Sequence, residues 1–503
     1  MIYDAVYNVK TGEFVIMTKP NPIALKAIIL IVSVVSLFSC KSFLEDFVFA
    51  PTAMFDLKKV GYQQTEYFIS GTADSYLPVS ELTSDGKWEV VKNQQAEYTT
   101  RIIVIRPIDP EKFNGTVVVE WNNVSGNADA TPEWSMAHTE FIREGYAWVG
   151  VTAQRKGIDN VGPFGLLDGI LEASLKTINP VRYKVLSHPG DNFSYSIYTQ
   201  AAQRVRYAEG KDYLGGLKIE KMIAAGESQS ASRMVSYINM LGKDNHLFDG
   251  FIVHSRLGSS APVSGEPLET MQPPDIVRIR DDLDKPVLML QTETDLFVAF
   301  EFFPGTAYES RQPDSDMFRL WEVAGTSHAD VYSVLGMFDN GQSDYYATPL
   351  KSSHAIPVLI RCSTYINGNP MHHFVVNAAF HAMDHWIRTG YPPSIAGRID
   401  IETDPLRIAR DEFGNALGGI RSPYMDVPTA TYAPQGQGHI LCEISGAMIP
   451  FSNEELHSIY HSSEDYLNQV QASTDQAVTD GFLRPADAAK VVSAATSFSR
   501  KLR

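Results

Sequence analysis

The chain has 503 residues, of which 44% are hydrophobic and 20% are charged, a composition typical of a globular protein with a large core. Its formal net charge is −17, because 59 acidic residues outnumber 42 basic ones. A surface this acidic repels phosphate backbones and anionic lipid headgroups, so the composition argues against a nucleic-acid partner.

The N-terminal segment has the features of a signal sequence. Residues 23–38 are apolar except for one lysine, and the uncharged part, residues 27–38, has the length of a signal-peptide core rather than that of a membrane span. The sequence LFSC, which ends at Cys40, resembles a bacterial lipobox, in which the cysteine becomes lipidated. We therefore expect residues 1–40 to be a signal segment, with Met17 as a possible true start, and the mature protein to be lipid-anchored in a bacterial cell envelope. A plain secretory signal, which would give a soluble periplasmic or secreted protein, and a membrane anchor are the alternatives.

Two cysteines follow Cys40 in the sequence, Cys362 and Cys442. In an oxidising envelope compartment these two thiols can form one disulfide. Their spacing in the sequence does not show whether their Cα atoms lie close enough, so the paired and the unpaired state both remain open.

After a linker over residues 41–55, we expect one domain over residues 56–503. β-Branched and aromatic residues bounded by turn formers predict strands at residues 61–77, 97–108 and 115–123. A helix is predicted at residues 131–145, and a nearly continuous apolar run predicts a buried strand at residues 146–154.

Further along the chain, strands and helices alternate. Helices are predicted at residues 194–210 and 230–240, and strands at residues 218–226, 248–256, 285–295 and 318–328. This alternation predicts an α/β fold with a parallel sheet covered by helices on both sides. Antiparallel strands that lead into a parallel sheet are the order found in the α/β-hydrolase fold. The region beyond Pro370 is predicted to be mostly helical.

Two long segments interrupt the alternation, at about residues 156–190 and 257–284. Insertions of this length are where lids and binding loops usually lie. Aromatic and apolar residues between positions 162 and 194 favour a lid over a partly hydrophobic pocket.

Ser228 lies where a predicted strand passes into a helix through the sequence GESQS. A serine becomes a nucleophile only when a base removes its proton and a third group orients that base. In α/β hydrolases the three groups occur in the order serine, acid, histidine, each after a strand, and Ser228, Asp295 and His328 follow this order. Glu293, near the end of the same strand as Asp295, is the alternative acid. All of these residues would lie at the carboxyl edge of one parallel sheet, where α/β active sites form.

The usual second glycine of a nucleophile elbow is missing after Ser228. Gly226 provides one small flanking residue, and Ser230 is small enough to replace the other. The backbone N–H of Gln229, at the helix start, is expected to stabilise an oxyanion. The loop after the third predicted strand should supply a second donor, namely the backbone N–H of Asn123 or Val124, assisted by the side chain of Asn122. An ordinary Asn/Gly turn is the alternative for this loop.

Several histidines could instead suggest a metal site. His381 and His385 lie one helical turn apart, a spacing that can bind zinc, but their helix is rich in apolar residues and has no HExxH motif, which favours a structural role. His372 and His373 lie nearby and alone keep the metal hypothesis open. His254, at a predicted strand end, either lines the pocket or is packed and hydrogen-bonded. Nucleotide-binding motifs are missing, so nucleotide cofactors have no support, and the serine mechanism needs no metal or organic cofactor.

Several long segments resemble the α/β-hydrolase-domain family in which the elbow has the sequence GESQSA. They include VVVEWNNVSG, YAWVGVTAQRKGI, RYKVLSHPGDNFSYSIYTQAA, AAGESQSASRM, FDGFIVHSR, VLMLQTETDL, VAGTSHAD, GGIRSPYMDVP and LCEISGAMIPFS. The resemblance covers most of the chain after about residue 55. It implies an α/β-hydrolase fold and a serine-hydrolase mechanism through Ser228, Asp295 and His328, and it implies much less about the substrate.

We therefore expect a serine hydrolase, and first of all a carboxylic ester hydrolase that forms an acyl-enzyme with a small-molecule ester. A serine amidase or peptidase that uses the same residues is one alternative. A non-catalytic ligand-binding lipoprotein on a hydrolase scaffold is the other.

Overall fold

The computed structural model describes residues 4–8, 13–17, 48–49, 52–161, 172–208, 212–243, 245–264, 273–297, 305–341, 355–356 and 360–502. The apolar part of the predicted signal segment and Cys40 lie outside these residues, and so do residues 162–171 and 265–272 of the two predicted insertions. At the N-terminus, β1 (Asp4–Asn8) and β2 (Glu13–Met17) form an antiparallel pair. None of the helices within the described ranges combines the length and the apolar character that crossing a membrane requires.

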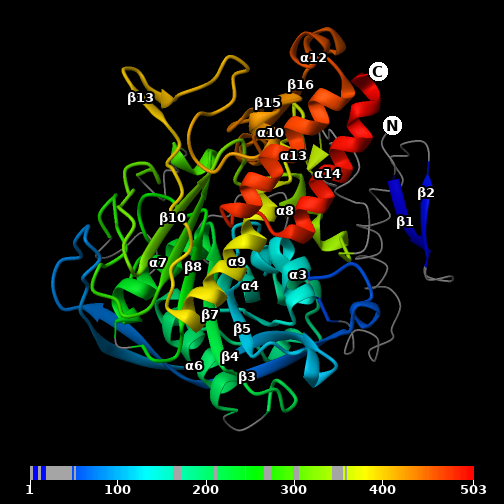
Figure 1. Cartoon of the computed structure of the whole chain (residues 1–503). Coiled ribbons are helices and arrows are strands. Elements are labelled where there is room, and N and C mark those ends of the chain that lie inside the picture. The colour runs from blue at the N-terminus through cyan, green and yellow to red at the C-terminus, as the bar shows by residue number, and fades with distance from the viewer. Residues whose placement is uncertain are drawn as a thin grey trace.

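A mixed eight-stranded sheet forms the centre of the molecule (Figure 1), in the strand order β10–β9–β8–β7–β5–β6–β4–β3. The antiparallel part consists of the long strands β3 (Tyr62–Pro78) and β4 (Val90–Pro107). The parallel part consists of β5 (Thr116–Trp121), β6 (Ala147–Val151), β7 (Lys221–Glu227), β8 (Gly250–His254), β9 (Val287–Thr292) and β10 (Phe318–Val323). The predicted α/β-hydrolase fold, with antiparallel N-terminal strands and a mostly parallel sheet, is confirmed.

Helices cover both faces of the parallel strands, which explains why these strands are mostly apolar. On one face, Val117 and Val119 of β5 pack in a core with α6 (Ser194–Tyr207) and α7 (Gln229–Tyr237). On the other face, Val118 packs in a second core with α3 (Pro132–Glu144) and α9 (Met371–Thr389). Because side chains alternate along a strand, one strand contributes to both cores.

Shorter elements complete the parallel half of the fold. They are α4 (Arg155–Asp159), α5 (Leu175–Ile178), α8 (Val331–Leu335), β11 (Ala355–Ile356) and β12 (Ile360–Arg361), and the one-turn 3₁₀ helices at Leu57–Val60, Pro110–Lys112, Tyr183–Val185, Asp191–Phe193, Thr294–Leu296 and Gly336–Phe338. The described part of the first insertion packs against the antiparallel strands, since Ser187 pairs with Thr99 of β4 and the Tyr183 hydroxyl donates to Glu66 of β3 at 2.9 Å.

The C-terminal region is helical, as expected, but it also contains two small hairpins. Its helices after α9 are α10 (Pro423–Asp426), α11 (Ile440–Ile444), α12 (Asn453–Ile459), α13 (Ser463–Thr479), α14 (Pro485–Ser499) and a final 3₁₀ turn, Arg500–Leu502. The hairpins pair β13 (Ile401–Thr403) with β14 (Leu406–Ile408) and β15 (Ala430–Ala433) with β16 (Ala447–Pro450). Such short strands carry little periodic signal, which is why they escaped prediction.

Cys362 and Cys442 form a disulfide, with their Cα atoms 5.5 Å apart. Their separation by 80 positions in the sequence left this proximity open before the structure was known. The bond joins the segment that follows β12 to helix α11. A disulfide is typical of proteins that fold in an oxidising compartment.

Candidate active site

Ser228 occupies the sharp turn between β7 and α7. Its backbone angles are φ 58° and ψ −119°, a strained conformation for a residue with a side chain, and strain of this kind concentrates at functional sites. The Ser228 N–H donates to the His254 carbonyl at 2.9 Å. A Cβ atom at Gly226 would lie 2.8 Å from the Ser230 carbonyl oxygen, so only glycine fits where the strand and the helix approach. Ser230 is the small residue opposite Gly226, in the place of the missing glycine.

Three of the predicted site residues form a hydrogen-bonded chain at the carboxyl edge of the sheet. Ser228 Oγ lies 2.7 Å from His328 Nε2, and His328 Nδ1 lies 2.6 Å from Asp295 Oδ1. Asp295 belongs to the 3₁₀ turn after β9, and His328 follows β10. The Asp295 side chain is fully buried and His328 is 7% exposed, so water competes little for these hydrogen bonds.

The charges around His328 favour its protonated form. Burial of the ring acts to lower its pKa, but the Asp295 carboxylate and, less strongly, Glu227 outweigh burial and raise the pKa of His328 to about 9. Burial acts to raise the pKa of Asp295, but the His328 imidazole outweighs it and holds the pKa of this carboxyl below its usual value. The pair is therefore poised to hold a proton on the imidazole rather than on the carboxylate.

Glu293, the alternative acid, points elsewhere. Its Oε2 accepts the Gly325 N–H at 2.7 Å, and its Oε1 accepts from Arg410 Nη2 at 2.8 Å. Its contacts thus hold the start of the loop that carries His328. The structure brings Asp295, and not Glu293, to the imidazole.

The loop after β5 is arranged differently from the expectation for Asn123. The Asn123 N–H donates to the Ala130 carbonyl at 2.8 Å, because the two residues close a short antiparallel bridge, so this N–H is not available to an oxyanion. The side chain of Asn122 is also engaged, since its Nδ2 donates to Asp129 at 3.0 Å. Within the described residues the Val124 N–H has no acceptor, and Gln229, as the first residue of α7, has an N–H that its helix leaves unbonded. Val124 and Gln229 thus remain the two candidate donors.

Glu227 is a neighbour of the site that sequence reasoning missed. Its Oε1 lies 3.7 Å from His328 Nε2, and its Oε2 accepts from Asn123 Nδ2 at 3.2 Å. Burial raises the pKa of Glu227 to about 7, although His328 and His254 act to lower it. Its position directly before Ser228 was the available signal, because the residue before the turn must lie at the same sheet edge.

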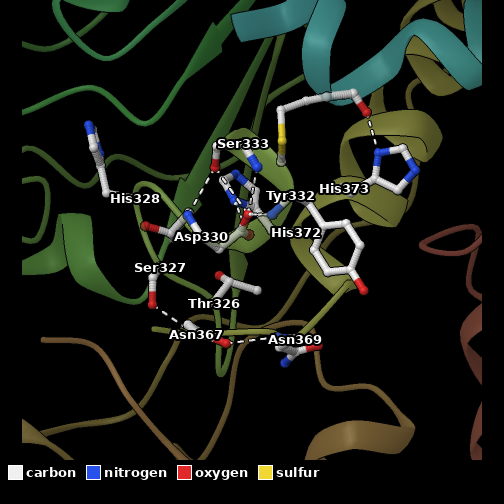
Figure 2. Close-up of polar contacts among 12 residues, drawn as sticks. Thr326, Ser327, His328, Asp330, Tyr332, Ser333, Asn367, Asn369, His372 and His373 are labelled. Atoms are coloured by element: carbon white, nitrogen blue, oxygen red, sulfur yellow. Dashed lines mark hydrogen bonds and ion pairs between the residues drawn. The ribbon is translucent and has the colours of Figure 1, made fainter. Parts of the chain in front are cut away.

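The histidines that suggested a metal site do not converge. His381 is half exposed beside Glu140, and His385 is exposed and close to Thr389 of the same helix. His373 is hydrogen-bonded to the Met136 carbonyl (Figure 2). His254 is buried, and its ring contacts Glu133 and His372. Across the described residues, no group of three or more histidine, cysteine or acidic side chains is arranged to hold a metal ion.

Comparison with solved structures finds chains of low sequence identity. An α/β serine hydrolase without a lid from Xanthomonas campestris, XC6422, is 15% identical over 51% of this chain and 86% of its own, with a TM-score of 0.27. Est1E from Butyrivibrio proteoclasticus is 12% identical over 52% of this chain and 94% of its own, with a TM-score of 0.28. The esterase Pf2001 of Pyrococcus furiosus is 10% identical over 54% of this chain and 84% of its own, with a TM-score of 0.29. No curated protein matches the chain.

The comparison with protein families gives a match over most of the chain. The family described as "Alpha/beta hydrolase domain" matches residues 40–493. This range includes the whole eight-stranded sheet and the chain formed by Ser228, His328 and Asp295. The protein therefore belongs to the alpha/beta hydrolase domain family and is a hydrolase.

Proposed function

We propose that this hydrolase cleaves carboxylic esters through an acyl-enzyme on Ser228. The observation that carries the proposal is the continuous chain of two hydrogen bonds, 2.7 Å from Ser228 to His328 and 2.6 Å from His328 to Asp295. A serine hydroxyl with a base in contact, and a base oriented by a buried carboxylate, is the arrangement that activates serine for attack on a carbonyl carbon.

The reaction proceeds in two halves. Ser228 Oγ attacks the ester carbonyl carbon while His328 Nε2 takes the hydroxyl proton, and Asp295 keeps the ring oriented through Nδ1–H. The N–H groups of Val124 and Gln229 stabilise the negative oxygen of the tetrahedral intermediate. The intermediate collapses to the acyl-enzyme, and His328 gives the proton to the departing alcohol. Water, deprotonated by His328, then attacks the acyl carbon. The bond between this carbon and Ser228 Oγ breaks, Oγ takes the proton back from His328, and the carboxylic acid leaves.

A fluorophosphonate tests the proposal, because it reacts with activated serines and needs no knowledge of the substrate. Protein that begins after Cys40 should gain the mass of one adduct, and peptide mapping should place it on Ser228. Ser228→Ala should gain none, and it should also fail to hydrolyse p-nitrophenyl esters. Folded wild-type protein that neither reacts nor hydrolyses any activated ester would refute the proposal and favour a binding protein. Hydrolysis of p-nitroanilides as fast as the matched p-nitrophenyl esters would favour an amidase.

We also propose that the mature protein is anchored in a bacterial envelope by a lipid on Cys40. The apolar segment before LFSC supports this, and the disulfide between Cys362 and Cys442 fits an oxidising compartment. Full-length protein should incorporate radiolabelled palmitate and partition with membranes, whereas Cys40→Ser should lose the label. Label that persists in the serine variant would contradict lipidation at this cysteine.

A further inference from the structure

Four buried side chains outside the proposed triad form a second chain of polar contacts beside it. Glu133 Oε2 lies 3.3 Å from His254 Nδ1, the Nε2 atoms of His254 and His372 lie 2.7 Å apart, and His372 Nδ1 lies 3.1 Å from Asp330 Oδ2. The four residues come from α3, β8, α9 and the loop before α8. Each side chain is at most 2% exposed, so protein groups alone determine its protonation state.

The number of protons in this chain follows from its geometry. Each Nδ1 faces a carboxylate, which accepts hydrogen bonds, so each Nδ1 carries a proton. Two ring nitrogens 2.7 Å apart also need one proton between them, since two lone pairs at this distance would repel each other. The two rings therefore hold three protons, one more than two neutral imidazoles, and the pair carries a single positive charge.

The surroundings of the pair agree with one charged and one neutral ring. Burial acts to lower the pKa of His254, but Glu133 outweighs it and the pKa is raised, whereas burial lowers the pKa of His372. Besides Glu133 and Asp330, the carboxyl groups of Glu227 and Asp295 also face the pair. The excess proton is thus surrounded by acidic groups and resides mainly on His254.

This chain of contacts reaches the elbow through His254 and the loop that carries His328 through Asp330. The His254 carbonyl accepts the Ser228 N–H at 2.9 Å, so the backbone of His254 holds the strained turn. Asp330, two residues after His328, caps α8 through hydrogen bonds from the Tyr332 and Ser333 N–H groups at 2.8 and 2.9 Å (Figure 2). Figure 2 also shows the His372 ring beside the Asp330 carboxylate.

We propose that His254 and His372 are positioning residues that share one proton between their Nε2 atoms. Through this proton they fix the position of the turn at Ser228 relative to the loop that carries His328. The proposal rests on the proposed function of Ser228 and His328. The shared proton fixes the distance between β8 and α9, and these two elements in turn fix the nucleophile and the base. A displacement of about 1 Å between reacting groups can cost about 10²-fold in rate, so such a clamp has a direct kinetic effect.

A metal ion between the two rings is the rival explanation, and the distance argues against it. Zinc binds each histidine nitrogen at about 2.0–2.1 Å, so two ligands in tetrahedral geometry have their nitrogens more than about 3 Å apart. The observed 2.7 Å is a hydrogen-bond distance.

The first test detects the shared proton without any use of activity. In protein with ¹⁵N-labelled histidine rings, the proton should give a far-downfield NMR signal and a coupling between two Nε2 nitrogens across the hydrogen bond. Both should disappear in His254→Gln and persist in His373→Gln. If the wild-type protein shows no such coupling near neutral pH, the shared proton does not exist and the proposal is overturned.

The second test separates positioning from general stability. His254→Gln should lower kcat for a p-nitrophenyl ester about 10- to 100-fold, with KM changed less than about twofold. Because the positive charge that faces Asp295 and Glu227, the two carboxyl groups beside His328, is lost, the acidic limb of the pH profile should move to higher pH. His372→Gln removes the other partner of the shared proton but leaves the end of β8 unchanged, and it should lower kcat by a similar factor.

His373→Gln is the matched control. His373 neighbours His372 on α9, is equally buried, and burial lowers its pKa to about 4, so its replacement removes no charge; its ring is hydrogen-bonded to the Met136 carbonyl of α3. This variant should keep kcat and the pH profile of the wild type even if its thermal stability falls. If His254→Gln behaves like His373→Gln in both kinetic readouts, the positioning role is refuted. If instead wild-type Ser228 never reacts with a fluorophosphonate, the proposed function has failed, and the NMR coupling alone decides whether the shared proton exists.

Discussion

Replacing Asp295 with asparagine is expected to lower kcat for ester hydrolysis by about 10⁴-fold with little change in KM. An asparagine amide can donate a hydrogen bond to His328 Nδ1, which favours the ring tautomer with its proton on Nε2. That tautomer cannot accept the Ser228 proton, and no carboxylate remains to stabilise the imidazolium. Steady-state kinetics on a p-nitrophenyl ester measures the loss, and circular dichroism checks that the variant is folded.

Glu293→Gln provides the comparison, because Glu293 lies near the end of the same strand and was the alternative acid. Its contacts are to Gly325 and Arg410, so the variant disturbs the loop before His328 but leaves the partner of the imidazole in place. We expect a loss in kcat of less than about 10²-fold. If Glu293→Gln is the more damaging of the two variants, or if Asp295→Asn loses less than about tenfold, Asp295 is not the group that orients His328.

Most of the sheet could be predicted from the sequence, because the signals that define it are local. The nearly continuous apolar run at residues 146–154 indicates a strand buried on both faces, and the structure buries every residue of β6, which lies within it. Strand ends in a parallel sheet lie at one edge, so the order Ser228, Asp295, His328 along the chain already implied that the three residues could meet there.

The choice between side chains a few residues apart could not be predicted in the same way. Whether Glu293 or Asp295 reaches His328 depends on how the 3₁₀ turn Thr294–Leu296 directs each side chain. Asn123 fails as a backbone donor because Ala130 folds back onto it, a contact that residue types alone do not specify. Local sequence patterns predict helices and strands. Which side chain or backbone N–H reaches the site depends on how these elements pack against each other.

Contacts between side chains that lie far apart in the sequence are harder still to predict. His254 and His372 are 118 positions apart, and each has an ordinary alternative as a packed core histidine. Only the crossing of α9 over the end of β8 brings their rings together. At this crossing His372 faces His254, whereas His373 faces α3.

Activity is expected to rise steeply with pH, with its acidic limb well above the ordinary histidine value. His328 must be neutral to accept the Ser228 proton, and its pKa is raised to about 9, mainly by Asp295 and, less strongly, by Glu227 against the effect of burial. A raised pKa means that the protonated, inactive form persists to higher pH. With a pKa of about 9, only about 1% of the enzyme is active at neutral pH, so kcat/KM should rise about 100-fold between pH 7 and the plateau.

Glu227→Gln isolates the contribution of the neighbouring carboxylate. Glutamine keeps an oxygen that can accept from Asn123 Nδ2 but removes the negative charge 3.7 Å from His328 Nε2, so the pKa of His328 should fall and the acidic limb should move to lower pH. The plateau should fall as well, because the imidazolium that forms during attack loses a stabilising charge. The measurement is kcat/KM of a p-nitrophenyl ester against pH, corrected for spontaneous hydrolysis.

Glu220→Gln makes the same change in net charge at a distant place. Glu220 lies just before the other end of β7, its side chain is 64% exposed, and it pairs with Arg388, so this variant should leave the pH profile unchanged. If both variants shift the limb equally, the shift reports the net charge of the protein rather than the site. If the wild-type limb lies at the ordinary histidine value and Glu227→Gln leaves it there, Glu227 does not act on the base, and its position before Ser228 serves only the packing of the turn.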